Sequence, residues 1–410
     1  MNVVKKYKKI PLLYKLMLGM VLGIILGIIL GEKASKVEIF GTLFLNLLKM
    51  ASIPLIMVNL ISGISSLDDP KMLGRIGIKI FTYYMLTTVI AAVLGIVGGL
   101  LFKPGVGLVL SESYEGSIGE IPNLLDTLIG MVPSNIFKAL SEGSLDQIVV
   151  FSAFAGIAVL LCKGEDKARL SSMFNSLANM FNRLVGIVMG YAPIGVCALI
   201  ANVVGQYGKS MFGPALKYII AISICFVIHW MFYFVVLFVT TGEKPLRVIK
   251  ASLKLIATTC STSSSLAAVP VNMEAADELG VSKSIYGFTI PLGSQMNKDG
   301  NAIMLTLSLI FAAQAVGITL SIPTIINATI IALLLTTGAG GIPGGALVTI
   351  AIIIDAFSLP VDVVAIISGV FFLLDLLNTT LNCYGDLIGT VIVDRSEKRR
   401  LKKAVYNAEL

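Results

Sequence analysis

The stretch Gly293-Ser-Gln-Met-Asn-Lys-Asp-Gly-Asn301 interrupts an apolar segment that runs from about Ser284 to Val316. Glycines flank its polar centre, and apolar residues resume directly afterwards, from Ile303 to Ala315. A helix broken here would free backbone carbonyls, while Asn297 and Asp299 would add an amide and a carboxylate oxygen. Hard cations such as sodium favour these ligands. The stretch therefore predicts a cation site in a broken helix, with a polar loop outside the apolar layer as the alternative.

The rest of the chain has the composition of a membrane protein. Of its 410 residues, 56% are hydrophobic and only 13% are charged, and the mean hydropathy is +0.91. Soluble domains are about a quarter charged. Long apolar blocks such as Ile10 to Leu30, Ile80 to Leu101 and Ile219 to Thr240 can each cross about 30 Å of hydrocarbon as a helix. Because open strand edges cannot face lipid, we expect an all-α integral membrane protein.

The placement of basic residues predicts the orientation of the chain. The net charge is +7, and basic residues gather beside apolar blocks in two clusters: Lys5, Lys6, Lys8, Lys9 and Lys15, and then Lys398, Arg399, Arg400, Lys402 and Lys403. Such clusters mark the cytoplasmic side of a membrane, so this charge does not indicate nucleic-acid binding. We therefore expect both termini in the cytoplasm and a multi-pass protein of the cell membrane.

The pattern of spans changes about two thirds of the way along the chain. Residues 1–240 contain roughly six ordinary spans, whereas polar residues interrupt the apolar blocks of residues 241–396, and a basic tail occupies residues 397–410. In the second region, segments 246–279 and 323–357 have arms too short to cross the bilayer, which indicates re-entrant hairpins. With the two spans 284–316 and 361–393, the sequence predicts eight transmembrane helices and two hairpins. Broken and duplicated elements of this kind are typical of secondary transporters.

The last span carries polar residues on one face. Asp375, Thr379, Asn382 and Asp386 follow a spacing of i, i+4, i+7 and i+11, and Asn378 borders the same stripe. An Asp at the bilayer centre costs about 2.5 to 3.5 kcal/mol, which several apolar residues are needed to offset. We therefore expect the two acids to be functional. The alternative is that they pair with a Lys or Arg, or lie near the membrane surface.

Both hairpins turn at residues suited to ligand contact. The first turns at Ser263-Ser-Ser265, shortly before Pro270, and the second turns within the glycine-rich segment 338–345. Small residues let backbone N–H groups approach a carboxylate, and glycines also allow a tip to move as a gate. Alternatively, the serine run is a linker and the glycine run is an ordinary turn.

Taken together, these motifs resemble the glutamate-transporter homologues, also called the dicarboxylate/amino acid:cation symporters. The resemblance covers the C-terminal half in order and spacing, and the N-terminal half is similar in its layout of spans. It implies a homotrimer that works as an elevator. Early spans would form the trimerisation scaffold, while the third and sixth spans, both hairpins and the last two spans would form the moving transport unit.

The resemblance also assigns site residues. Asp375 matches the carboxylate that binds the α-amino group of a substrate, and Asn382 matches the contact to the α-carboxylate, shared with the Ser265 backbone. The substrate-binding set that it implies is Ser264, Ser265, Asn301, Gly341, Ile342, Asp375, Asn378, Thr379 and Asn382.

Three sodium sites are implied in the same way. The first comprises Gly293, Asn297, Asn382 and Asp386, and a deeper one comprises Tyr84, Thr87, Thr88, Asn297 and Asp299. A third would be made mainly by carbonyls, with Gln295, Thr336, Thr337 and Ala339. The co-transported ion is thus expected to be Na+.

Asn378 departs from the family pattern in a way that bears on the substrate. Members that carry acidic substrates have an Arg at this position, and an Asn donates hydrogen bonds but no charge. A desolvated substrate carboxylate without a cation would cost several kcal/mol. Since Asp375 is retained, we expect sodium-coupled import of a small neutral amino acid. An acidic amino acid or a dicarboxylate, carried with sodium or protons, is the alternative.

Lys298 is the second departure, at a position where the family commonly has Met. Its ammonium would replace one cation or weaken cation binding, or else its stem would extend to water.

Two other classes of protein fit the sequence less well. A channel needs a continuous polar pore, whereas the polar residues here gather in one cluster. An enzyme needs an acid/base or metal set, and the single histidine, His229, lies in an apolar block without a partner at motif spacing. We therefore interpret His229 as a core or interfacial residue.

Overall fold

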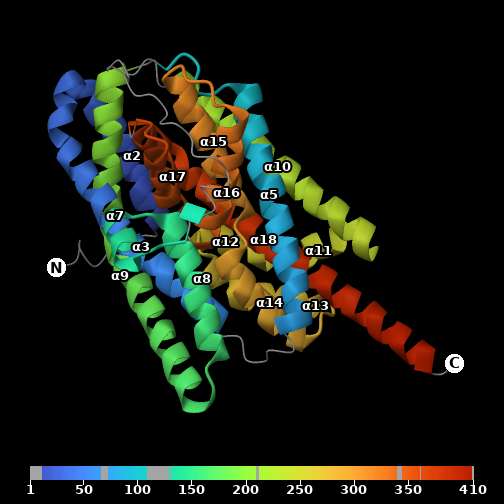
Figure 1. The fold of residues 1–410 in the computed structure, drawn as a ribbon. Coiled ribbons are helices and arrows are strands. Elements are labelled where there is room, and N and C mark those ends of the chain that lie inside the picture. The colour runs from blue at the N-terminus through green and yellow to red at the C-terminus, as the bar shows by residue number, and fades with distance from the viewer. Residues whose placement is uncertain are drawn as a thin grey trace, which may run out of the picture.

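The computed structural model describes residues 12–65, 73–108, 129–130, 132–208, 212–338, 344–360 and 362–408. These residues form helices joined by turns, and no strand occurs among them (Figure 1). The prediction of an all-helical protein is confirmed.

The first part of the chain supplies helices long enough to cross a bilayer. The described elements are α2 (Leu12–Leu30), η1 (Gly31–Val37), α3 (Glu38–Ser65), η2 (Leu73–Gly77), α5 (Ile78–Phe102), α7 (Ile136–Glu142), α8 (Leu145–Leu161), α9 (Gly164–Tyr207) and α10 (Phe212–Thr241). By length and composition, four described stretches could span a membrane: Tyr14–Phe44, Arg75–Phe102, Gly164–Gln206 and Phe212–Thr241.

Helices α2 and α3 both pack on α9 along the same side of the molecule (Figure 1). Gly19, Gly23 and Gly27 recur every four residues on α2, so they share one face that lies against α9. A Cβ atom on any of them would come within 3.0 Å of α9, including the carbonyl oxygens of Pro193 and Cys197. Glycine at these positions therefore allows the two helix backbones to approach closely.

The second part of the chain contains the interrupted elements. They are α11 (Pro245–Ala251), α12 (Leu253–Thr262), α13 (Ser265–Glu278), α14 (Lys283–Met296), α15 (Asp299–Ala315), α16 (Ile322–Gly338), α17 (Gly345–Ala356) and α18 (Asp362–Ala408). The predicted break of residues 293–301 is real but shorter, because only Asn297 and Lys298 lie outside the two helices. The span predicted to end near residue 393 continues as helix through the basic segment.

Helices α12 and α13 form the first predicted hairpin and pack on each other. Ser263 ends α12 in the left-handed conformation, with φ 47°, and its N–H bonds to the Thr259 carbonyl. Ser264 then begins α13 by accepting a hydrogen bond from the Ala267 N–H, as N-cap residues do. The serine run is therefore a capped turn between two helices rather than a linker. The tip of the second hairpin, residues 339–343, lies outside the described residues.

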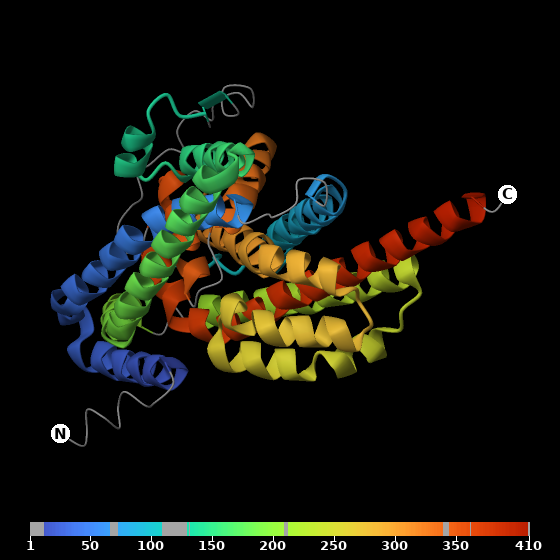
Figure 2. The same ribbon diagram turned by 90° about the horizontal axis from the view of Figure 1, so that it is seen from below.

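Around α18 the other C-terminal helices assemble. It contacts α10, α12, α13, α14 and α15, while α15 packs closely on α5. Viewed from below, α18 crosses this group and extends well beyond it (Figure 2). The broken element α14–α15 is consequently held between α5 on one side and α18 on another.

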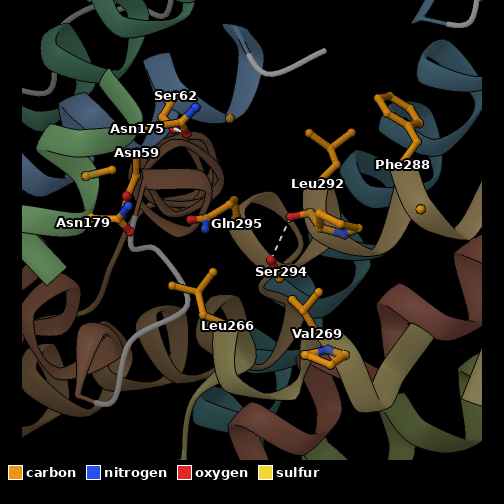
Figure 3. A pocket seen from close by; sticks show the side chains of 15 residues that line it. Asn59, Ser62, Asn175, Asn179, Leu266, Val269, Phe288, Leu292, Ser294 and Gln295 are labelled. Atoms are coloured by element: carbon orange, nitrogen blue, oxygen red, sulfur yellow. Dashed lines mark hydrogen bonds between the residues drawn. The ribbon is translucent and has the colours of Figure 1, made fainter. Parts of the chain in front are cut away.

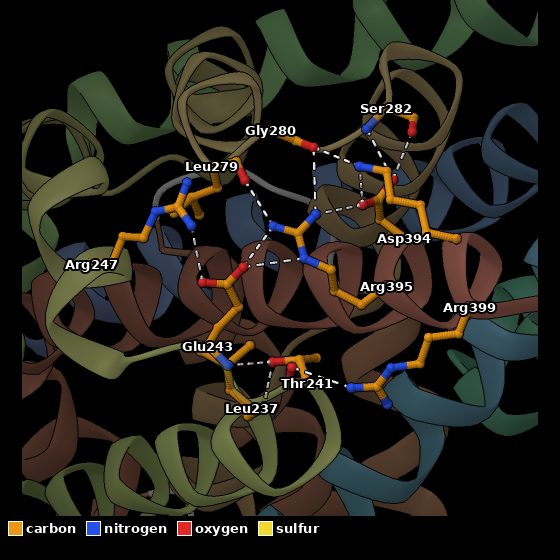
Figure 4. A network of polar contacts seen from close by, with 11 residues as sticks. Leu237, Thr241, Glu243, Arg247, Leu279, Gly280, Ser282, Asp394, Arg395 and Arg399 are labelled. Carbon is orange, nitrogen blue, oxygen red and sulfur yellow. Dashed lines mark hydrogen bonds and ion pairs between the residues drawn. The ribbon is translucent and has the colours of Figure 1, made fainter. Parts of the chain in front are cut away.

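Near the exit of α18 from the bundle, a polar network ties it to two turns (Figure 4). Asp394 accepts hydrogen bonds from the N–H and hydroxyl of Ser282, at 3.0 and 2.7 Å, and pairs with Lys398 at 2.8 Å. Arg395 donates to Glu243, between α10 and α11, at 2.6 Å. Burial alone would raise the pKa of Asp394, but the hydrogen bonds from Lys398 and Ser282 outweigh it and lower this pKa.

A second ion pair at this end joins α18 to the start of α5. Glu397 pairs with Arg75 at 2.7 Å and with Lys79 at 2.8 Å, while its own side chain is only 6% exposed. Burial opposes its charge, yet the hydrogen bonds from Arg75 and Lys79 hold the pKa of Glu397 below its ordinary value. Asp394 thus connects α18 to the α13–α14 turn, Glu397 connects it to η2 and α5, and Arg395 connects it to Glu243 after α10.

Asp394→Asn should lower the apparent melting temperature, because it leaves Arg395 and Lys398 without their buried carboxylate, at a cost of about 1–3 kcal/mol. Glu165→Gln, in an exposed pair with Arg169, is the control and should change stability by less than about 1 kcal/mol. Thermal unfolding of the purified variants measures both.

The difference in stability between wild type and Asp394→Asn should depend on pH. A carboxyl whose pKa is lower in the folded than in the unfolded state stabilises the fold above the unfolded pKa, about 3.9 for Asp, and loses this effect below it. The difference in melting temperature between wild type and Asp394→Asn should therefore be largest at pH 6 and should decrease as the pH falls below about 4. A constant gap over this range would contradict the role of the Asp394 charge.

Candidate functional site

The break between α14 and α15 lies against the polar stripe of α18, deep in the helix bundle. Asn297 and Asp299 are fully buried, and Asp375 and Asp386 are 3% and 1% exposed. The polar stretch is therefore internal to the helix bundle and not an exposed loop. None of the three acids forms an ion pair with a Lys or Arg of the described residues, so the predicted alternative of such a pair does not hold.

Asp299 is held by three side chains from two other helices. The Thr88 hydroxyl of α5 lies 2.6 Å from Oδ1, and the Tyr233 hydroxyl of α10 donates to Oδ2 at 2.6 Å. His229 Nε2, also on α10, lies 3.1 Å from the same oxygen. The Thr88 hydroxyl is in addition 2.7 Å from the Tyr84 carbonyl, which the Thr87 hydroxyl also contacts at 3.2 Å, so Tyr84, Thr87, Thr88 and Asp299 of the predicted deeper site lie together.

His229 and Tyr233 were missed as site residues. The interpretation of His229 as a core or interfacial residue agrees with its complete burial, but its contact with Asp299 was not predicted. The partner lies 70 residues further along the chain, beyond the reach of any local motif. The available signal was the spacing of His229 and Tyr233, which places two polar rings on one face of an otherwise apolar span.

Asp386 and Asn297 form the neighbouring part of the cluster. The Asn297 amide donates to Asp386 Oδ1 at 3.1 Å and to the Asn382 carbonyl at 3.3 Å. Its own oxygen, Oδ1, is buried and has no hydrogen-bond partner. Gly293 lies so close that a Cβ there would come within 3.0 Å of the Asp386 carboxylate and the Tyr84 hydroxyl. The residues of the first predicted sodium site are thus in contact.

A chain of amides leads from this cluster to Asp375. The Asn382 amide donates to the oxygens of Asn301, at 3.2 Å, and Asn378, at 3.3 Å, and Asn378 donates to Asp375 at 3.0 Å. Asn382 also accepts the Gly300 N–H at 2.8 Å. The order of these bonds fixes Asn378 with its oxygen toward Asn382 and its amide toward Asp375.

Asp375 also faces the second hairpin. The Gly344 N–H, directly after the tip and before α17, donates to Asp375 Oδ2 at 3.3 Å. Thr379 is buried one turn further along α18, on the predicted stripe. Asp375 therefore contacts the N-cap residue of α17, in the second hairpin.

Lys298 occupies the break itself, and its ammonium group is internal. Its Nζ donates to the Ser294 carbonyl at 2.6 Å and to the Ser265 hydroxyl, at the start of α13, at 3.1 Å. The residue is 2% exposed. The interpretation that its stem extends to water is therefore wrong.

The third predicted sodium site is not assembled by the described residues. Thr336 is buried and its hydroxyl donates to the Leu333 carbonyl at 2.9 Å. Ala339, Gly341 and Ile342 lie outside the described residues, as does the side chain of Thr337. These assignments stay predictions.

Gln295 faces away from the carboxylates, into a cavity of about 460 Å³ between α3 and α9 on one side and α13 and α14 on the other. Figure 3 shows its side chain directed toward Asn59 and Asn179. Gln295 Oε1 and Asn59 Nδ2 are both buried without a hydrogen-bond partner. The cavity is lined by neutral polar and apolar groups and lies between helices α3 and α9 and helices α13 and α14.

The cluster has the chemistry of an alkali-cation site. It offers the Asp299 and Asp386 carboxylates, the unpartnered Asn297 oxygen and the Tyr84 carbonyl, which are the hard oxygen ligands that such ions prefer. Buried carboxylates are stable only when they are compensated by charge or hydrogen bonds. A cation bound here would be coordinated by these oxygens and would compensate the charge of the carboxylates.

These features, a helical membrane bundle with hairpins and oxygen ligands at a helix break, define a cation-linked transporter. The chain matches the sodium:dicarboxylate symporter family over residues 12–396 and belongs to this family. It is therefore an integral membrane transporter and not an enzyme.

Relatives of the chain are named for different substrates. It is 30% identical to the proton/sodium-glutamate symport protein of Geobacillus stearothermophilus, with 95% of each chain covered. It is 28% identical to the C4-dicarboxylate transport protein of Bacillus subtilis, with 88% of each chain covered. It is 31% identical to the neutral amino acid transporter B(0) of Homo sapiens, covering 94% of this chain and 79% of that protein.

Asp299→Asn should weaken cation binding, because it removes a charged ligand next to Asn297 and Tyr84. We expect the apparent Kd for sodium to rise at least about tenfold, which corresponds to about 1.4 kcal/mol. The sodium dependence of the melting temperature measures it without any transport assay. Glu142→Gln, at an exposed acid, is the control, and an unchanged sodium response in Asp299→Asn would remove Asp299 from the site.

Proposed function

We propose that this protein is a sodium-coupled symporter that imports a small neutral amino acid. The observation that carries the proposal is the group of three buried carboxylates, Asp299, Asp375 and Asp386, without an Arg or Lys ion pair among the described residues. Uncompensated buried charge is costly. Co-transported sodium ions would compensate Asp299 and Asp386, and a substrate ammonium group would compensate Asp375.

The neighbours of Asp375 support a substrate without a second carboxylate. Asn378 faces Asp375 with its amide, and the next two side chains along the stripe, Thr379 and Asn382, are also neutral. An α-carboxylate would bind at the Asn382 amide and the backbone at Ser265, where α13 begins and its N–H groups are exposed to an anion. The Asn301 amide, bonded to Asn382, would border the same molecule.

Acidic substrates are the second candidate, and Lys298 is the observation that favours them. Its ammonium lies beside Ser265, so it would reach a substrate carboxylate at the tip of the first hairpin. The relatives named for glutamate and C4-dicarboxylates support this alternative. The relative named for neutral amino acids supports the first candidate to the same degree. Coupling to protons in place of sodium belongs to the same alternative.

An elevator in a homotrimer is the proposed mechanism of movement. The packing supports two units: α2, α3 and α9 pack together, whereas α5, α10, α14, α15 and α18 surround the site. The cavity beside Gln295 reduces the contact between the two units. The first unit would be the trimer scaffold, and the second would carry the site across a cell membrane with both termini in the cytoplasm.

The energy for accumulation would come from the cations. A neutral zwitterion gains nothing from the membrane potential, whereas each sodium ion that falls through 100 mV releases about 2.3 kcal/mol. Tenfold accumulation requires about 1.4 kcal/mol. One ion therefore supports a gradient of about fortyfold, and additional ions support more.

Uptake into proteoliposomes tests the proposal with a panel of radiolabelled neutral and acidic amino acids and dicarboxylates, with and without a sodium gradient. We expect sodium-dependent uptake of a small neutral amino acid. Uptake of glutamate or succinate in its place would favour the second candidate, and ion current without uptake would contradict symport.

Asp375→Asn should abolish binding of substrates that carry an α-amino group, because it removes the carboxylate that pairs with this group. Sodium binding in the absence of substrate should persist, since Asp299 and Asp386 remain. Equilibrium binding of the transported amino acid measures the loss, and affinity within threefold of wild type would contradict the assignment.

A further inference from the structure

Lys298 places one amino group among the buried carboxylates. Its ammonium bonds only to two neutral oxygens, the Ser294 carbonyl and the Ser265 hydroxyl, and forms no ion pair among the described residues. Asn297, the residue before it, donates to the Asp386 carboxylate, and Asp299 follows it directly in the chain. The Lys298 amino group therefore lies beside the carboxylate cluster without binding to any of its members.

The two oxygens that hold this ammonium are the kind that bind a metal cation. The Ser294 carbonyl belongs to the last turn of α14, where the break at Asn297 leaves carbonyls without a helical N–H partner. Such carbonyls carry the negative end of the helix dipole and attract cations. The Ser265 hydroxyl supplies the second oxygen. A Lys side chain thus provides a positive charge where the broken helix would attract a free ion.

We propose that Lys298 is a tethered cation that takes the place of one co-transported ion. The inference rests on the proposed cation coupling of this site. An ammonium fixed to the chain needs no binding from solution, so its charge is present at any sodium concentration. Substrate binding then requires one sodium ion fewer than it would with a neutral residue at this position.

A fixed charge also changes the electrical balance of the cycle. The Lys298 charge moves with the site in both the loaded and the empty direction, so it contributes no net charge transfer over a complete cycle. A free ion in its place would be released on one side and would contribute one charge. The wild-type protein should therefore move less charge per substrate molecule than its Lys298→Met variant. It should also reach a lower ratio of internal to external substrate concentration.

The test measures how substrate affinity depends on sodium in wild type, Lys298→Met and Lys298→Arg. The Kd of the transported amino acid is determined in detergent over a hundredfold range of sodium, with ionic strength held constant by choline. A logarithmic plot of Kd against sodium should be steeper by about one in Lys298→Met. A tenfold drop in sodium would then weaken binding about tenfold more in this variant than in wild type. Lys298→Arg, which keeps the charge, should retain the wild-type slope.

Reversal potentials in proteoliposomes give a second, independent readout. The charge moved per substrate should rise by about one in Lys298→Met and stay constant in Lys298→Arg. Lys298→Gln, which keeps a polar side chain of similar length, replaces the Met variant should the latter fail to fold.

Each outcome separates this inference from the proposed function. Equal slopes in wild type and the neutral variant, with substrate binding retained, would overturn the tethered cation. A uniform loss of affinity at equal slope would overturn it too and would assign Lys298 to a substrate carboxylate. Absence of any sodium dependence in wild type would instead contradict the proposed sodium coupling.

Discussion

The structure depends on the burial of carboxylates at the point where one helix is interrupted. Asp299 begins α15 directly after the break, and Asp386 faces the same point from α18. Charges in such surroundings are stable only with dense hydrogen bonding and compensating cations. The surrounding elements meet this requirement: α5 and α10 supply hydroxyls to Asp299, and the Asn297 amide reaches Asp386. The close packing of helices around the break follows from the need to supply these contacts.

Much of this arrangement was visible in the sequence because membrane burial makes polar residues conspicuous. Gly293 and Gly300 around a polar run predicted the break, and the helical spacing of Asp375 and Asp386 predicted one functional face. The length of the break was overestimated, since helix α14 runs on to Met296 despite its Ser and Gln residues. Polar side chains extend a helix when their backbone bonds are kept, so polarity alone marks a site but not its helix ends.

Contacts between distant segments were beyond the sequence. The pairing of Asp299 with His229 and Tyr233 joins residues 66 to 70 positions apart, and nothing local to either segment encodes it. The direction of a side chain was equally hidden. Lys298 turns inward to Ser294 and Ser265, whereas Gln295, three residues earlier, faces the cavity next to α3. Where a helix ends, neighbouring side chains point in different directions. Only the folded backbone defines these directions.

The continuity of α18 has a mechanical consequence. One uninterrupted helix carries Asp375 and Asp386 within the site. Further along, it carries Asp394, which accepts hydrogen bonds from Ser282, and Glu397, which pairs with Arg75 and Lys79. From Asp375 to Glu397 the helix rises about 33 Å, at 1.5 Å per residue. A helix of this length behaves as a stiff rod, so a shift of the carboxylates would displace the ion-paired end by a similar amount. Groups at the exposed end of α18 would thereby report the position of the buried site to whatever meets them at the membrane surface.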